Sequence, residues 1–313
     1  VGLFNKVSIR VMIAEVWENW KSVFVPIMIL LLVGALAGTW LVSGIIPAMV
    51  YYGLQVLNPS IFLPASVVIA AIISIATGSS WTTSATVGIA LVGIGSVLGI
   101  PSGMIAGAVI SGAYFGDKMS PMSDTTNLAP AMAGTDLFTH IRYMSLTTVP
   151  TIMITIIIFS VISFNLDISG KTDISDLLTT IENTFNITPW LFIVPLIVVG
   201  LIIAKTKPLI ALTIGVLLAG IFAIIFQPEV LGYLSNSSFK SVFYAMFTET
   251  QISTSHEKLT DLFQAKGVFG MKWTVLLILS AMVFGGVMDA IGALSRITKE
   301  LLKLVKSTFG LFA

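Results

Sequence analysis

The sequence predicts an all-α polytopic membrane protein. Hydrophobic residues make up 56% of the chain and charged residues only 10%, whereas soluble domains carry about 25% charged residues. From Ser22 to Gly116 the chain contains no charged residue and no histidine, which is typical of segments that cross a bilayer. Two aspartates, a lysine and several hydroxyls then follow within residues 116–127. Ionisable side chains inside a membrane usually belong to a transport or ion site.

Apolar segments set the positions of the predicted elements. In residues 1–22 the apolar side chains recur at helical spacing and the charged ones lie elsewhere, which predicts an amphipathic helix at the membrane interface. Residues 292–306 predict an amphipathic helix at the cytoplasmic interface and not a span, because their apolar side chains share one face and their lysines lie off it. The predicted spans are nearly uncharged and approach the roughly 20 residues that a crossing needs. They fall at residues 23–42, 143–164, 189–204, 209–226 and 273–291.

Charged residues between the spans predict the orientation of the chain. Basic residues flank the cytoplasmic ends of membrane helices. Here they lie before the first and second spans, between the third and the fourth, and after the last, whereas the loop at 165–188 is acidic. We therefore expect an integral protein of a bacterial-type plasma membrane with a cytoplasmic N-terminus. In this arrangement residues 43–142 make a single net crossing.

That long segment predicts a hairpin followed by a broken helix. Residues 61–76 are expected to enter the membrane, turn within 77–84, and return through 85–99 as a re-entrant hairpin. The next helix is interrupted at residues 117–127, where Pro121 prevents regular helix geometry. Non-helical backbone at membrane depth occurs only where it is buried in protein or lines a cavity. The hairpin tip and the helix break should therefore face each other across a site.

A weak internal repeat relates residues 30–57 to residues 278–305. The aligned residues are Gly38 with Gly286, Gly44 with Gly292, and Leu54 with Leu302. Inverted repeats are typical of secondary transporters, which predicts an inverted-repeat transporter fold that is incomplete at both ends of this chain. The regions we expect are an interfacial helix (1–22), a first half with span, hairpin and broken helix (23–142), connecting spans and loops (143–272), and the start of a second repeat (273–313).

Four motifs carry a family resemblance. They are Gly34-Ala-Leu-Ala-Gly-Thr-Trp40, Pro47-Ala-Met-Val-Tyr-Tyr-Gly53, Ala76-Thr-Gly-Ser-Ser-Trp81 and Ser111-Gly-Ala-Tyr-Phe-Gly-Asp-Lys-Met-Ser-Pro-Met-Ser-Asp-Thr-Thr-Asn-Leu-Ala-Pro130. Together they resemble the NhaC family of sodium/proton antiporters, which also includes carriers described as sodium-lactate/malate-proton antiporters. The resemblance implies two inverted halves, each with a re-entrant hairpin and a broken helix.

Asp117 and Asp124 are the candidate ion-binding and proton-coupling carboxylates. A carboxylate can bind Na⁺ when ionised and carry H⁺ when protonated, so competition at one group is sufficient for exchange. Na⁺ is a hard ion and prefers oxygen ligands, and we expect it at Asp124 and Asn127. The other neutral oxygens nearby belong to Ser120, Ser123 and Thr125. The alternative is a surface loop held by an ion pair, either between Asp117 and Lys118 or between an aspartate and an arginine.

The hairpin tip is the second candidate part of the site. Its small and hydroxyl-bearing residues are Thr77, Gly78, Ser79, Ser80, Thr82 and Thr83. Their alternative role is packing, because small residues let membrane helices approach closely.

The leading functional hypothesis is secondary active exchange of Na⁺ for H⁺ through competition at intramembrane carboxylates. The alternative is a Na⁺/H⁺-coupled antiporter of organic anions such as malate or lactate. Anion recognition usually uses arginine; none lies between Arg10 and Arg142, although Lys118 could serve. An enzyme is disfavoured, because the chain has no cysteine and only two isolated histidines. We expect no cofactor and no nucleic acid. The expected partners are Na⁺, H⁺ and the lipid bilayer, with a homodimer as a candidate assembly.

Overall fold

The computed structural model describes residues 7–56, 58–121, 123, 125–126, 129–130, 134–166, 174–204 and 206–304. Within these residues six helices are long and apolar enough to cross a membrane: Ile9–Val42, Pro59–Thr77, Ser80–Val97, Leu137–Asn165, Pro208–Phe226 and Lys272–Ala290. A bent pair of shorter helices could supply a seventh crossing. The protein is thus an all-α polytopic membrane protein, as its composition predicted.

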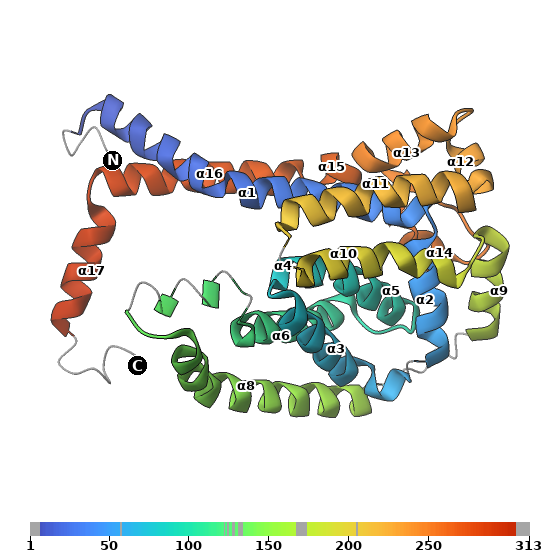
Figure 1. Ribbon diagram of the computed structural model, residues 1–313, viewed down its shortest axis with the longest axis horizontal. Coiled ribbons are helices and arrows are strands. Elements are labelled where there is room, and N and C mark those ends of the chain that lie inside the picture. The colour runs from blue at the N-terminus through green and yellow to red at the C-terminus, as the bar shows by residue number, and fades with distance from the viewer. Residues whose placement is uncertain are drawn as a thin grey trace. The chain divides into compact units, whose positions relative to one another are not determined.

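The helices before residue 120 are α1 (Ile9–Val42), α2 (Ile45–Val56), the 3₁₀ turn η1 (Pro59–Ile61), α3 (Phe62–Thr77), α4 (Ser80–Thr83), the π-helical η2 (Ser84–Gly88), α5 (Ile89–Val97) and α6 (Ser102–Met119) (Figure 1). The middle of the chain contains α8 (Leu137–Asn165), α9 (Ile174–Thr184), η3 (Pro189–Phe192), α10 (Ile193–Ile203) and α11 (Pro208–Phe226).

The remaining elements are α12 (Pro228–Leu234), α13 (Ser238–Phe247), β1 (Thr250–Gln251), α14 (Glu257–Leu262), β2 (Gln264–Ala265), α15 (Gly267–Gly270), α16 (Lys272–Ala290) and α17 (Ala293–Leu304). The two short strands pair antiparallel, with Thr250 opposite Ala265.

The chain forms two compact units, residues 1–31 with 271–313, and residues 32–270. In the first unit the beginning of α1 packs against α16. The Trp20 indole donates a hydrogen bond to the Leu279 carbonyl at 3.2 Å, and the Asn19 amide donates to Asp289 at 3.3 Å. The predicted interfacial segment and first span are one continuous helix, which contains Pro26.

In the second unit α3 and α6 pack along each other, and α8 packs against both (Figure 1). A Cβ atom on Gly112 would lie 2.1 Å from the Val67 carbonyl oxygen, and one on Gly116 would lie 2.5 Å from the Ala71 carbonyl oxygen. The two backbones therefore touch, as small residues four apart allow in membrane helices. Because the contacts advance in the same direction along both chains, α3 and α6 are parallel and end on the same side.

The two helices and the turn of the predicted hairpin are present, but the turn is shorter than residues 77–84. Each arm, Pro59–Thr77 and Ser80–Val97, is long and apolar enough to cross a membrane, so the re-entrant course of the hairpin stays a prediction. Gly78 ends α3 in the left-handed conformation, with φ of 66°, and Ser79 starts the next helix by accepting a hydrogen bond from the Thr82 amide at 3.2 Å. This side-chain cap lets a helix begin at once, so Thr82 and Thr83 lie in α4 and not in a loop. A π-helical turn follows in η2, and such turns are frequent at functional sites.

The span predicted at 189–204 needs a correction. The helical stretch Pro189–Ile203 is shorter than the other candidate spans, and it meets the helix Ser175–Thr184 at a bend of 82°. That preceding helix lies in the stretch at 165–188 that was expected to be an acidic loop. The structure instead pairs the two helices as one broken span or re-entrant loop.

The two copies of the internal repeat have the same local structure. In the predicted alignment Val42, the last residue of α1, is equivalent to Ala290, the last residue of α16. Ile45, the first residue of α2, is equivalent to Ala293, the first residue of α17. Between them lie Gly44 and Gly292, both left-handed, with φ of 80° and 64°. The separate helix predicted after the last span is thus confirmed as α17, while its place at the interface stays a prediction.

Candidate ion-binding site

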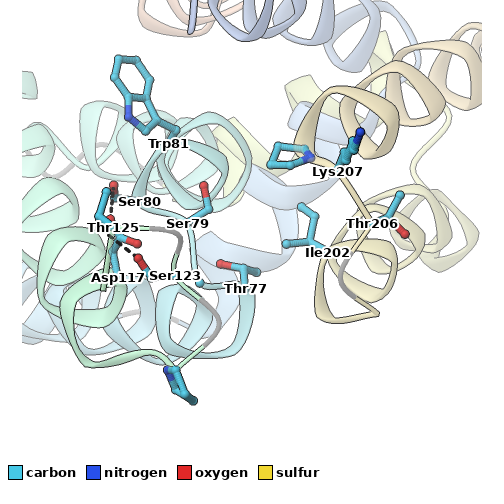
Figure 2. Close-up of a pocket in the computed structure, with 13 residues that line it drawn as sticks. Thr77, Ser79, Ser80, Trp81, Asp117, Ser123, Thr125, Ile202, Thr206 and Lys207 are labelled. Carbon is cyan, nitrogen blue, oxygen red and sulfur yellow. Dashed lines mark hydrogen bonds between the residues drawn. The ribbon is translucent and has the colours of Figure 1, made fainter. Parts of the chain in front are cut away.

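A pocket of about 450 Å³ lies between the hairpin tip, the end of α6 and the connection from α10 to α11 (Figure 2). The pocket therefore includes the two features that the sequence analysis expected to face each other. Its lining residues are Thr77, Gly78, Ser79, Ser80, Trp81, Asp117, Pro121, Ser123, Thr125, Ile202, Thr206, Lys207 and Pro208.

Among the described residues that line this pocket, Asp117 is the one with a carboxylate side chain. It lies on the last turn of α6 and is half-buried, and the buried Ser80 hydroxyl donates a hydrogen bond to its Oδ2 atom at 3.1 Å (Figure 2). A hydroxyl group can rotate and present a lone pair instead of its proton. Ser80 and Asp117 can therefore both turn oxygen lone pairs toward a cation.

Two helix C-termini meet at the pocket. α3 ends at Thr77 and α6 ends at Met119, and their parallel packing places both ends beside Asp117. Ser120 joins them, because its hydroxyl donates to the Ile75 carbonyl at 2.7 Å. A helix C-terminus carries unsatisfied carbonyls and partial negative charge. These two ends contribute partial negative charge beside Asp117, whereas the beginnings of α4 and α11 and the Lys207 side chain, which also line the pocket, contribute positive charge.

The other predicted residues divide into two groups. Ser123 and Thr125 line the pocket, with their hydroxyl oxygens 3.0 Å apart. Ser120, Thr82 and Thr83 do not line it; their hydroxyls bond instead to the Ile75 carbonyl, the Ser79 hydroxyl and the Ser79 carbonyl. Asp124 and Asn127, which were expected to hold Na⁺, lie outside the described residues.

Two alternatives gave Lys118 a role at the site, either as the partner of Asp117 or as the group that recognises an organic anion. The structure places Lys118 elsewhere. No salt bridge joins it to Asp117, although both residues are described. It lines a separate cavity of about 290 Å³ between α6 and α8, together with Tyr114, Thr147 and Thr151. Neither the Asp117–Lys118 pair nor a place for Lys118 in the Asp117 pocket is present.

The far side of the pocket was not expected from the sequence. Ile202, Thr206, Lys207 and Pro208 come from the end of α10 and the beginning of α11, and Trp81 follows the hairpin turn (Figure 2). The basic residue at 207 served only to indicate orientation. No local pattern connects residue 207 with residue 117, because long-range packing alone brings them to one cavity.

Three curated relatives resemble most of the chain. The Malate-2H(+)/Na(+)-lactate antiporter of Bacillus subtilis (strain 168) is 37% identical over 288 residues, which cover 90% of this chain and 58% of the relative. The Na(+)/H(+) antiporter NhaC of the same strain is 38% identical over 292 residues, or 93% of this chain and 63% of the relative. The Na(+)/H(+) antiporter NhaC of Alkalihalophilus pseudofirmus (strain ATCC BAA-2126 / JCM 17055 / OF4) is 36% identical over 305 residues, or 95% and 64%.

The chain therefore spans about three fifths of the length of these relatives. No solved structure matches it. The family model described as the Na⁺/H⁺ antiporter family matches residues 112–313, which include Asp117 and the far wall of the pocket. The chain belongs to the Na⁺/H⁺ antiporter family.

Proposed function

We propose that this chain takes part in secondary active exchange of Na⁺ for H⁺, in which the two ions compete for the carboxylates Asp117 and Asp124. One observation carries the proposal. The parallel packing of α3 and α6 brings two helix C-termini, the Ser80 hydroxyl and the Asp117 carboxylate to one pocket. In transporters with broken helices, carbonyls at helix C-termini coordinate Na⁺ or H⁺.

Competition follows from the chemistry of a carboxylate. Ionised Asp117 offers oxygen lone pairs to Na⁺, and the proton that neutralises it removes the charge that holds the metal ion. The Ser80 hydroxyl can bond to the ionised carboxylate when Na⁺ is absent. Each ion therefore displaces the other, and movement of the site between the two sides of the membrane couples their gradients.

The orientation belongs to the same proposal. The protein is an integral membrane protein, and its basic flanks favour a cytoplasmic N-terminus. The connection between α10 and α11 carries Lys207 and lines the pocket. The pocket of this structure is therefore assigned to the cytoplasmic side.

The test is the full-length transporter reconstituted in liposomes, with dye-measured proton movement on addition of Na⁺. Asp117→Asn preserves the size of the side chain but removes its charge and its titration. We expect it to lose Na⁺-dependent proton movement by at least about 100-fold, or about 2.8 kcal/mol, because the amide neither carries the charge that holds Na⁺ nor exchanges a proton. Asp117→Glu retains a titratable group and should keep part of the activity.

Asp136→Asn is the matched control. Asp136 is an exposed aspartate that caps α8 and does not line the pocket. Asp124→Asn belongs in the same series, since Asp124 is the other proposed carboxylate. If Asp117→Asn exchanges Na⁺ for H⁺ at the wild-type rate and with the wild-type pH dependence, Asp117 is not part of the exchange site. The same result in both Asp117→Asn and Asp124→Asn would refute the proposed mechanism.

A further inference from the structure

The cavity of about 290 Å³ between α6 and α8 has no part in the proposed exchange. The two helices are antiparallel, because Thr148 donates a hydrogen bond to the Met119 sulfur at 3.6 Å and a Cβ atom on Gly107 would lie 3.6 Å from the Phe159 ring. The end of α6 therefore lies beside the early turns of α8. Arg142 precedes Thr148 by six residues, or about 9 Å of helix, so the cavity begins just inside the membrane surface that is proposed to be cytoplasmic.

Lys118 is the charged side chain among the residues described at this cavity. None of the described residues forms a salt bridge or a hydrogen bond with its ammonium group, and none bonds to the hydroxyl of Tyr114, which lies one turn earlier on the same face of α6. An unpaired charge at membrane depth is costly. The two groups therefore offer unused N–H and O–H donors, and an anion is the ligand that satisfies them.

Threonines of α8 line the opposite wall of the cavity and offer acceptors. The Thr151 hydroxyl donates to the Thr147 carbonyl at 2.8 Å, and the Thr155 hydroxyl donates to the Thr151 carbonyl at 2.9 Å, so these protons are used within the helix. Each hydroxyl oxygen keeps lone pairs that can accept a hydrogen bond from a ligand. The cavity therefore suits a ligand with an anionic group facing α6 and hydroxyl groups facing α8.

Exposed apolar side chains continue from the cavity toward the middle of the membrane. They are Ile110 on α6 and Ile154, Ile157 and Ile158 on α8. Ile110 lies two turns before Lys118, or about 12 Å farther from the cytoplasmic surface. A ligand of this cavity therefore has polar contacts at one end and hydrocarbon contacts at the other, as a phospholipid does.

We propose that this cavity binds an anionic phospholipid of the cytoplasmic leaflet whose headgroup carries hydroxyls, as in phosphatidylglycerol. The phosphodiester accepts hydrogen bonds from Lys118 and Tyr114, and the glycerol hydroxyls donate to the threonine oxygens. Basic pockets between membrane helices on the cytoplasmic side bind anionic headgroups, and a lysine side chain can extend from the hydrocarbon to the headgroup level. The inference goes beyond the proposed exchange of Na⁺ for H⁺, and it requires only that α8 crosses the membrane.

The test is native mass spectrometry of the purified full-length transporter in detergent, titrated with phosphatidylglycerol, phosphatidylcholine or phosphatidic acid that have the same acyl chains. Wild type should bind phosphatidylglycerol with a Kd at least about tenfold lower than that for phosphatidylcholine. Lys118→Gln should raise the Kd for phosphatidylglycerol roughly tenfold or more, the usual effect of losing a hydrogen bond to a charged group. Lys118→Arg should retain most of the affinity.

Two nearly isosteric variants test the two parts of the headgroup separately, and they decide the question if Lys118→Gln does not fold. Tyr114→Phe and Thr151→Val each remove one hydroxyl, so each should raise the Kd for phosphatidylglycerol about fivefold. Thr151→Val should leave the binding of phosphatidic acid unchanged, because that lipid lacks the headgroup glycerol. Arg142→Gln is the control, since Arg142 is an exposed basic residue of α8 that does not line the cavity.

The inference is wrong if wild type binds phosphatidylglycerol no more tightly than phosphatidylcholine. It is also wrong if Lys118→Gln or, where that variant does not fold, Tyr114→Phe binds as wild type does, or if Arg142→Gln loses as much affinity as Lys118→Gln. Glycerophosphoglycerol, which has the same headgroup without acyl chains, is measured in parallel. Equal affinity for this water-soluble compound would overturn a membrane lipid as the occupant.

Discussion

Asp117 shows how a single side chain depends on its neighbours. The residue follows Gly116, whose missing side chain lets α6 touch the α3 backbone. That contact places Asp117 within hydrogen-bond distance of Ser80, although the two lie far apart in the sequence. The proposed cation site at Asp117 therefore depends on a glycine that has no polar chemistry of its own.

Asp136 provides a pH-dependent prediction at the same scale. It caps α8 by accepting hydrogen bonds from the Phe138 and Thr139 amides, each at 3.0 Å. A hydrogen bond from the Thr139 side chain contributes most to holding the pKa of Asp136 below its ordinary value of 3.8, and the hydrogen bonds from the Phe138 and Thr139 amides add to the effect. Because the folded-state pKa is lowered, the stabilisation by ionised Asp136 is fully present above the unfolded-state pKa. It is lost as the pH falls through the folded-state pKa.

We therefore expect Asp136→Ala to lower the Tm of the full-length protein at neutral pH. As the pH falls through the folded-state pKa, which lies below 3.8, the wild-type carboxyl becomes protonated and the difference in Tm should shrink. Thermal unfolding of both proteins across the pH range provides the measurement. A difference that is constant or grows in acid would show that the charge of Asp136 does not contribute to the cap.

At the scale of elements, the contact between α3 and α6 positions the pocket. Gly112→Ala places a Cβ atom 2.1 Å from the Val67 carbonyl oxygen, so one helix must move. Overpacking of this kind costs about 1–3 kcal/mol. We expect a lower Tm and weaker apparent Na⁺ affinity, because the separation of the helices also moves Asp117 away from Ser80.

Gly103→Ala is the matched control on the same helix. A Cβ atom there meets no atom within 4 Å, and alanine has a higher helix propensity than glycine. Its Tm should equal or slightly exceed that of the wild type. Equal Tm and equal Na⁺ affinity in Gly103→Ala and Gly112→Ala would mean that the close approach does not determine the site.

At the scale of the whole molecule, the crossing helices predict which residues face each side of the membrane. Lys207 directly precedes α11 and Tyr233 lies on α12 after it, while α11 has 19 residues, or about 28 Å of helix. The chain contains no cysteine. Single cysteines introduced into it can therefore report the two sides separately.

Lys207→Cys should react with a membrane-impermeant thiol reagent in inside-out vesicles, and Tyr233→Cys should react in intact cells. Both side chains are exposed in the structure, so burial does not protect either one. The reverse pattern would invert the proposed orientation. Labelling of both from one side would show that α11 does not cross.

Local sequence determined the class of fold and part of the site. The absence of charge from Ser22 to Gly116 predicts membrane helices, because an unpaired charge is costly in hydrocarbon. Two glycines of the proposed repeat, Gly44 and Gly292, were also visible locally, since left-handed backbone favours glycine. Asp117 could be identified because a carboxylate at the end of an apolar run is expensive to retain.

Only the tertiary structure decided what surrounds that carboxylate. It separated Lys118 from the pocket, brought Lys207 to it, and shortened the hairpin turn to Gly78 and Ser79. These outcomes depend on parallel packing of α3 with α6 and on the position of the α10–α11 connection. Such contacts join residues far apart in the chain, and their energies arise from shape and close approach, which hydropathy and spacing along a sequence do not contain.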